Sequence, residues 1–250
     1  MGAHPPSRPT ALARMADDRV HLRLMMALTF TTGMVDAIGF LGLDRVFVGN
    51  MTGNVVILGM AVVGTDDFPV VGPALALIGF LLGAAHGGRV LRGAPPGWSG
   101  RVTSSLGTVA AITLVLGVAV LAADHLPEPL TIATTSLLGA AMGLQAAVAR
   151  HIGVAEVTTV VVTSTLTALA SQSRIAGGTG ERGGRRALAA VLILAGAAAG
   201  AVLLRAGAGA GLLVAGAIMA AVAAVGAAHA RAVRSGPLPS SAPVQAEPTT

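Results

Sequence analysis

The segment that decides the fold is VFVGNMTGNVVILG, residues 46–59, an apolar run interrupted by small and polar residues. The interruption, Gly49-Asn50-Met51-Thr52-Gly53-Asn54, combines flexible glycines with amide and hydroxyl groups that lipid cannot satisfy. It predicts a re-entrant or broken helix whose backbone groups face a protein-lined cavity. A half-helix that begins here would favour an anion or a carboxylate at its free N–H groups. The alternative interpretation is close helix packing through small and polar residues.

Outward from this stretch, the chain is a series of apolar segments. They span residues 22–43, 46–64, 69–88, 105–123, 130–149, 153–172, 187–204 and 209–229. Each has about 18–22 residues, enough to cross a hydrocarbon core of about 30 Å at about 1.5 Å per residue. The runs are continuous and do not alternate, which favours helices over a membrane barrel.

The composition excludes a water-soluble domain. Of the 250 residues, 54% are hydrophobic and 11% are charged, whereas a soluble domain carries about 25% charged residues. All 16 cationic residues are arginines at the ends of apolar runs, which predicts anchoring of helix ends and not nucleic-acid binding. The lack of cysteine excludes disulfides, thiolate metal sites and cysteine nucleophiles.

The arginines favour six net crossings over eight. If all eight segments cross, ten arginines lie inside and six outside. If 22–43 and 46–64 together make one net crossing, and 130–149 and 153–172 another, thirteen arginines lie inside. Only Arg205 is then clearly outside, with Arg45 and Arg150 inside the paired segments. Because arginine concentrates on the cytoplasmic side, we expect six net crossings with both termini cytoplasmic.

Two stretches indicate an internal repeat. Residues 46–59 align with residues 157–170, VTTVVVTSTLTALA, and small residues recur at matching places further on. These are Gly79, Gly83 and Gly87 in the first half and Gly196 and Gly200 in the second. Three net crossings per half would invert the second half, as in many secondary transporters. Sequences this rich in alanine, glycine and valine also produce chance matches.

We therefore predict an all-α polytopic transmembrane helix bundle with about six net crossings and two inverted three-crossing repeats. Re-entrant or broken helices are expected at about 46–64 and 153–172. The predicted parts are a disordered cytoplasmic segment 1–20, a membrane domain 21–230 with repeats 22–123 and 130–229, and a disordered tail 231–250.

Polar residues inside the apolar segments are the candidates for a substrate or ion pathway. A carboxylate as deep as Asp36 must be protonated, paired or directed into a wet cavity, so it is a candidate ligand or a partner of Thr or Asn on a neighbouring helix. Gln145 is a candidate to face it, and the hydroxyls of 158–167 could line a path or bond back to their own helix. The candidates are Asp36, Asn50, Thr52, Gly53, Asn54, Gln145, Thr163 and Thr165.

Other features predict packing and no catalysis. Gly79, Gly83 and Gly87 recur every four residues, and with Gly196 and Gly200 they predict close helix packing. The histidines do not cluster, and no hydrolase, phosphate-loop or dinucleotide motif occurs, so we expect no enzyme, metal or cofactor.

Residues 33–59, GMVDAIGFLGLDRVFVGNMTGNVVILG, and 143–170, GLQAAVARHIGVAEVTTVVVTSTLTALA, resemble the two signatures of the YoaK family of bacterial membrane proteins. The resemblance covers about residues 22–230. It implies an integral protein of the bacterial inner membrane with about six helices and no established binding residues. Many members have Asn where this chain has Ala146 and Gly where it has Ser164, so no polar role is implied at position 146.

The best-supported functional hypothesis is a transporter or permeation pathway for a small solute or ion, with Asp36 as its titratable or ion-binding group. The alternative is a non-transporting scaffold or assembly protein that packs through glycine-rich helix faces. The expected partners are the lipid bilayer, a small solute or ion, and a second copy of the chain, with no nucleic acid. A transporter predicts a water-accessible cavity at Asp36 and Asn50, and a scaffold predicts dry, saturated hydrogen bonds there.

Overall fold

The computed structural model describes residues 11–64, 68–123, 125–153, 162–173, 176–178 and 183–235, and over these residues the ordered elements are all helical, as predicted. In chain order they are α1 (Ala11–Gly42), α2 (Met51–Val62), α3 (Val71–Leu91), α4 (Gly100–Ala122), α5 (Glu128–Ile152), α6 (Val162–Ser171), α7 (Gly183–Leu203), a short 3-10 helix η2 (Leu204–Ala206) and α8 (Ala208–Ser235).

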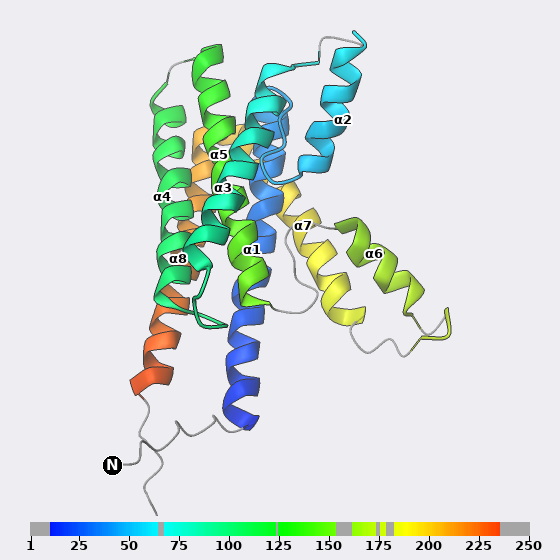
Figure 1. Cartoon of the computed structure of the whole chain (residues 1–250). Coiled ribbons are helices and arrows are strands. Elements are labelled where there is room, and N and C mark those ends of the chain that lie inside the picture. Colours follow the sequence, from blue (N-terminus) through cyan, green and yellow to red (C-terminus); the bar gives the residue numbers. More distant parts are fainter. Residues whose placement is uncertain are drawn as a thin grey trace, which may run out of the picture.

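Six of the described helices are long and apolar enough to cross a bilayer, namely α1, α3, α4, α5, α7 and α8. Successive long helices run in alternate directions, so α1 begins and α8 ends at the same end of the bundle (Figure 1). The prediction of an all-α bundle with six crossings is confirmed by these helices.

The helices α2 and α6 are too short to cross. With 12 and 10 residues they are about 18 and 15 Å long, against a hydrocarbon core of about 30 Å. The chain turns back after α1, descends beside it, and rises again as α2 (Figure 1). Segment 46–64 therefore enters and leaves the bundle at one end. Residues 154–161, which precede α6, lie outside the described residues.

Glycines bring the long helices into close contact in pairs. The helix α3 packs on α5, α1 on α7, and α4 on α8. A Cβ atom on Gly83 would overlap the carbonyl oxygen of Ala140 in α5, and one on Gly196 would overlap the carbonyl oxygen of Phe30 in α1. The other three glycines predicted to pack, Gly79, Gly87 and Gly200, also face α5 or α1. Their faces are thus used inside the bundle.

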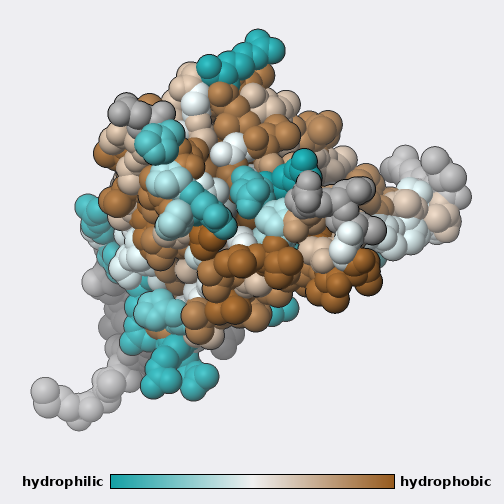
Figure 2. Space-filling model, turned by 90° about the horizontal axis from the view of Figure 1, so that it is seen from above, coloured by the Kyte–Doolittle hydropathy of each residue, from teal (hydrophilic) through white to brown (hydrophobic). Residues whose placement is uncertain are grey.

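The outer surface carries large apolar side chains. Leu81 and Leu82 of α3, Val115 of α4 and Leu194 of α7 are all more than half exposed. Figure 2 shows one end of the bundle from above, where hydrophilic residues form separate patches among apolar ones. A surface of this kind suits a lipid environment, where apolar exposure carries no cost.

The described arginines are divided very unequally between the two ends of the bundle. Only Arg45, after α1, and Arg205, in η2, lie at the end opposite to the start of α1. Arg150 lies in the last turn of α5, at the same end as the start of α1. The sequence left the sides of Arg45 and Arg150 open, and the paths of α1 and α5 place them at opposite ends.

Both terminal helices are longer than the sequence boundaries suggest. The helix α1 already begins at Ala11, inside the segment 1–20 predicted to be disordered, and α8 continues to Ser235, beyond the predicted boundary at 230. These ends are joined, because His229 Nε2 lies 2.8 Å from Asp17 Oδ1. Because Asp17 and His229 are distant in sequence, this contact leaves no local signal. Residues 1–10 and 236–250 lie outside the described residues.

Candidate functional site

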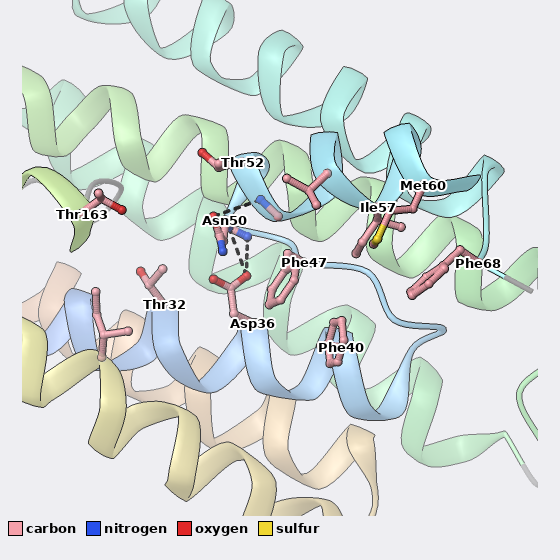
Figure 3. A pocket seen from close by; sticks show the side chains of 14 residues that line it. Thr32, Asp36, Phe40, Phe47, Asn50, Thr52, Ile57, Met60, Phe68 and Thr163 are labelled. Carbon is pink, nitrogen blue, oxygen red and sulfur yellow. Dashed lines mark hydrogen bonds between the residues drawn. The ribbon is translucent and has the colours of Figure 1, made fainter. Parts of the chain in front are cut away.

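A pocket of about 590 Å³ opens where α1, the start of α2, the first turn of α6 and α7 meet. Figure 3 shows it from close by, with Asp36 pointing from α1 toward the start of α2. The lining residues are Thr32, Asp36, Phe40, Phe47, Gly49, Asn50, Thr52, Gly53, Val56, Ile57, Met60, Phe68, Thr163 and Ile193. Among these described residues, Asp36 is the one ionisable group.

Asp36 holds in place the segment that descends from the end of α1 to the start of α2, at residues 48–50. Its Oδ1 accepts backbone N–H groups from Val48 at 2.9 Å, Gly49 at 2.7 Å and Asn50 at 3.3 Å. In a continuous helix these N–H groups would bond to carbonyl groups of the same helix. Lipid offers no acceptor to the non-helical backbone here, so the carboxylate of Asp36 accepts the bonds. One of the two interpretations of Asp36 was a bond to a Thr or Asn side chain on a neighbouring helix, whereas the structure shows bonds from backbone amides. The carboxylate of Asp36 therefore binds the residues just before α2, which begins at Met51.

The two asparagines of the polar stretch have different tasks. Asn50 caps α2, since its side chain accepts the N–H of Gly53 at 3.3 Å, and its side chain is otherwise exposed. Asn54 is fully buried and bonds Phe47 twice, accepting its N–H at 2.9 Å and donating to its carbonyl at 2.6 Å. Asn54 therefore positions Phe47 and does not line the pocket.

The glycines of this stretch allow close approach. A Cβ on Gly49 would lie 3.0 Å from Thr32 Cγ2 and 3.4 Å from Asp36 Oδ2, and one on Gly53 would lie 2.5 Å from Phe47 Cδ2. Gly49 thus lets the descending segment reach the carboxylate, and Gly53 leaves room for the ring of Phe47.

Gln145 lies close to the site, and its hydrogen bond goes to Thr32 and not to Asp36. Its Nε2 donates to Thr32 Oγ1 at 3.1 Å, and that hydroxyl donates to the carbonyl of Leu28 at 2.9 Å. Gln145 is 1% exposed, and its Oε1 has no hydrogen-bond partner among the residues that the structure describes. The partner of Gln145 is thus Thr32, one helical turn before Asp36 on α1.

The hydroxyl-rich stretch reaches the pocket at one described position. Thr163, in the first turn of α6, lines the pocket, whereas Thr165 is not among the lining residues. Residues 158–161 of the predicted stretch lie outside the described residues. The two short helices therefore contribute Thr52 and Thr163, from their first turns, to one pocket.

Aromatic residues are the part of the site that sequence reasoning missed. The chain has five phenylalanines, and three of them, Phe40, Phe47 and Phe68, line the pocket. Phe40 and Phe47 are stacked with ring centroids 4.7 Å apart, and the Arg45 guanidinium lies 5.6 Å from the centroid of Phe68. Their concentration between residues 40 and 68, beside the polar stretch, is the signal that could have revealed them.

Six helices long enough to span, with a short helix whose first turn lines a pocket beside α1, define a multi-pass integral membrane protein. The model of the family described as "Protein of unknown function (DUF1275)" matches residues 24–225, and the chain belongs to this family.

The chain is also similar to UPF0700 transmembrane protein YoaK of Bacillus subtilis (strain 168), with 34% identity over 147 residues. The match covers 58% of this chain and 64% of the relative, so the chain spans somewhat less than two thirds of that protein's length. The resemblance to the YoaK family is thereby confirmed. No solved structure matches the chain.

Proposed function

We propose that this protein is a transporter or permeation pathway for a small solute or ion, with Asp36 as the ligand at its centre. The observation that carries the proposal is the pocket of about 590 Å³, which brings Asp36 and Asn50 to the start of a helix that does not cross the membrane. Discontinuous helices with their ends at a midplane site are the usual construction of secondary transporters. The proposal includes no catalytic step.

The state of the polar groups favours transport over a scaffold. A scaffold predicts Asp36 and Asn50 in dry, saturated bonds, yet Asn50 is exposed and all three N–H bonds to Asp36 use one carboxylate oxygen. The glycine faces that a scaffold would offer to partners are covered by this chain's own α5 and α1. Both observations support the transporter hypothesis.

We further propose that the halves are inverted repeats around this pocket. Two reciprocal contacts support this. A Cβ on Gly33 of α1 would meet Ile193 and Ala197 of α7, and a Cβ on Gly143 of α5 would meet Phe80 and Ala84 of α3. Each contact becomes the other when the two halves are exchanged. Alternating access by one half rocking against the other would follow from this arrangement.

The orientation we propose places both termini in the cytoplasm of a bacterial cell, because the arginine-rich end of the bundle is the end where α1 begins. The chain has no cysteine, so single cysteines can report the side directly. In intact cells a membrane-impermeant maleimide should label Ala206→Cys and leave Ser235→Cys unlabelled, and permeabilisation should expose both. The reverse pattern in intact cells would contradict the orientation.

Transport is tested by Asp36→Asn in proteoliposomes screened with small anions, amino acids, organic amines and protons. The amide can still accept backbone N–H bonds, so the substitution removes the charge and retains the fold. We expect uptake to fall at least about tenfold, since about 1.4 kcal/mol of lost charge interaction already gives that factor.

The matched control is Asp44→Asn, the same chemical change at an exposed residue outside the pocket lining. Asp44 has φ 62°, a conformation that asparagine tolerates. Its uptake should equal that of the wild type. Full uptake by Asp36→Asn, or no uptake of any solute by the folded wild type, would refute the proposed function.

A further inference from the structure

Resting on the proposed function, we infer that the pocket takes a small organic monocation, an amine or quaternary ammonium that carries an apolar group. Asp36 is its counter-ion, and Phe40, Phe47 and Phe68 form the wall for its apolar part.

The charge of the site favours a cation. The backbone N–H groups of Val48, Gly49 and Asn50 would attract an anion, but they are already directed at Asp36 Oδ1. An incoming anion would meet the carboxylate and no lining cation, because Asp36 is the one ionisable group among the described lining residues. None of the three bonds uses Oδ2, which leaves that oxygen to accept a bond from a ligand.

The chemistry of the walls favours an organic cation over a metal ion. Hard metal cations need about six to eight oxygen ligands, and the described residues contain no group of three or more acidic or histidine side chains that could hold one. The hydroxyl of Thr32 is already committed to Leu28 and Gln145. Carbon dominates the remaining wall, through three phenyl rings, Ile57 and Met60.

Phenyl rings attract cations through their negatively charged faces. An example lies beside the pocket, where the guanidinium of Arg45, which is not a lining residue, lies over the ring of Phe68. Phe47 is the best-placed ring for a ligand at Asp36, since it lies between Asp36 and Phe40 in Figure 3. Its backbone is fixed on both sides by the buried amide of Asn54. The polar stretch thus places a carboxylate and an aromatic ring side by side.

The shape suits a ligand with two different ends. In Figure 3 the threonines Thr32, Thr52 and Thr163 lie to one side of Asp36 and the phenylalanines to the other. The volume of about 590 Å³ lies within the range of about 300–1,000 Å³ for organic-ligand pockets. A bare inorganic ion would leave most of that space unfilled.

The test is equilibrium binding of radiolabelled benzyltrimethylammonium to the full-length protein in lipid nanodiscs, with empty nanodiscs subtracted. Phenylpropionate serves as an anion of similar shape, and sodium as the inorganic cation. We expect saturable binding of benzyltrimethylammonium that neither of the other two displaces at equal concentration. Asp36→Asn should weaken it at least about tenfold and Phe47→Leu about three- to tenfold, while Asp44→Asn should bind as the wild type does.

The binding of each variant is compared with that of the wild type only if the variant shows a thermal unfolding transition, which indicates that it is folded. Saturable cation binding that depends on both Asp36 and Phe47 supports the inference. If phenylpropionate binds instead, or if proteoliposomes take up an anion or an inorganic ion by way of Asp36 without binding the organic cation, the substrate class is wrong and the proposed function survives. If the folded protein binds and transports none of the probes, both fail.

Discussion

Replacing Asp36 with leucine is expected to lower the free energy of unfolding by about 2–4 kcal/mol. Leucine is close to aspartate in size but offers no acceptor, so the N–H groups of Val48, Gly49 and Asn50 lose their partner. Val48 and Gly49 are buried, and an unsatisfied buried N–H costs about 1–3 kcal/mol. Asn50 is exposed, so its N–H can find another partner at less cost.

The measurement is thermal or denaturant unfolding of the purified protein in detergent, beside Asp36→Asn. Asparagine keeps an acceptor oxygen, so its unfolding midpoint should stay near that of the wild type. The pair separates the two roles of Asp36, since leucine removes both charge and acceptor, and asparagine removes the charge alone. Equal midpoints for leucine and wild type would show that the descending segment does not depend on Asp36.

Gly83→Ala should destabilise the contact between α3 and α5 by about 3 kcal/mol or more, at the upper end of what overpacking costs. The new methyl group would overlap the carbonyl oxygen of Ala140, and a backbone atom cannot move aside as a side chain can. The helices must therefore separate, which also weakens neighbouring contacts such as that of Gly143 with Phe80.

The control for Gly83→Ala is Gly88→Ala on the same helix. No described atom outside its own stretch of helix lies within 4 Å of the position that its Cβ would take, so alanine should be neutral or gain up to about 1 kcal/mol from higher helix propensity. Unfolding midpoints in detergent check both variants. If the two variants have equal midpoints, the close packing of α3 on α5 does not contribute to stability.

The candidate site was only partly predictable from the sequence. Asp36 and Asn50 could be found because a carboxylate and an amide inside apolar runs are costly to place in lipid. Their partners could not, since the bonds from Asp36 to residues 48–50 depend on where the chain turns back after α1. Asn54 is likewise costly to place in lipid. Only its bonds to the backbone of Phe47 show that it positions the ring of that residue.

The sequence by itself determined the class of protein, the six crossings and the failure of 46–64 to cross. These follow from segment length, apolar composition and the placement of arginine, which are properties of the chain relative to the bilayer. Only the tertiary structure decided which helices pair, that Gln145 reaches Thr32 across the bundle, and that three phenylalanines stand beside one carboxylate. The physical reason is that lipid selects apolar residues without specifying neighbours, whereas helix pairing depends on the shapes of faces that meet only after insertion.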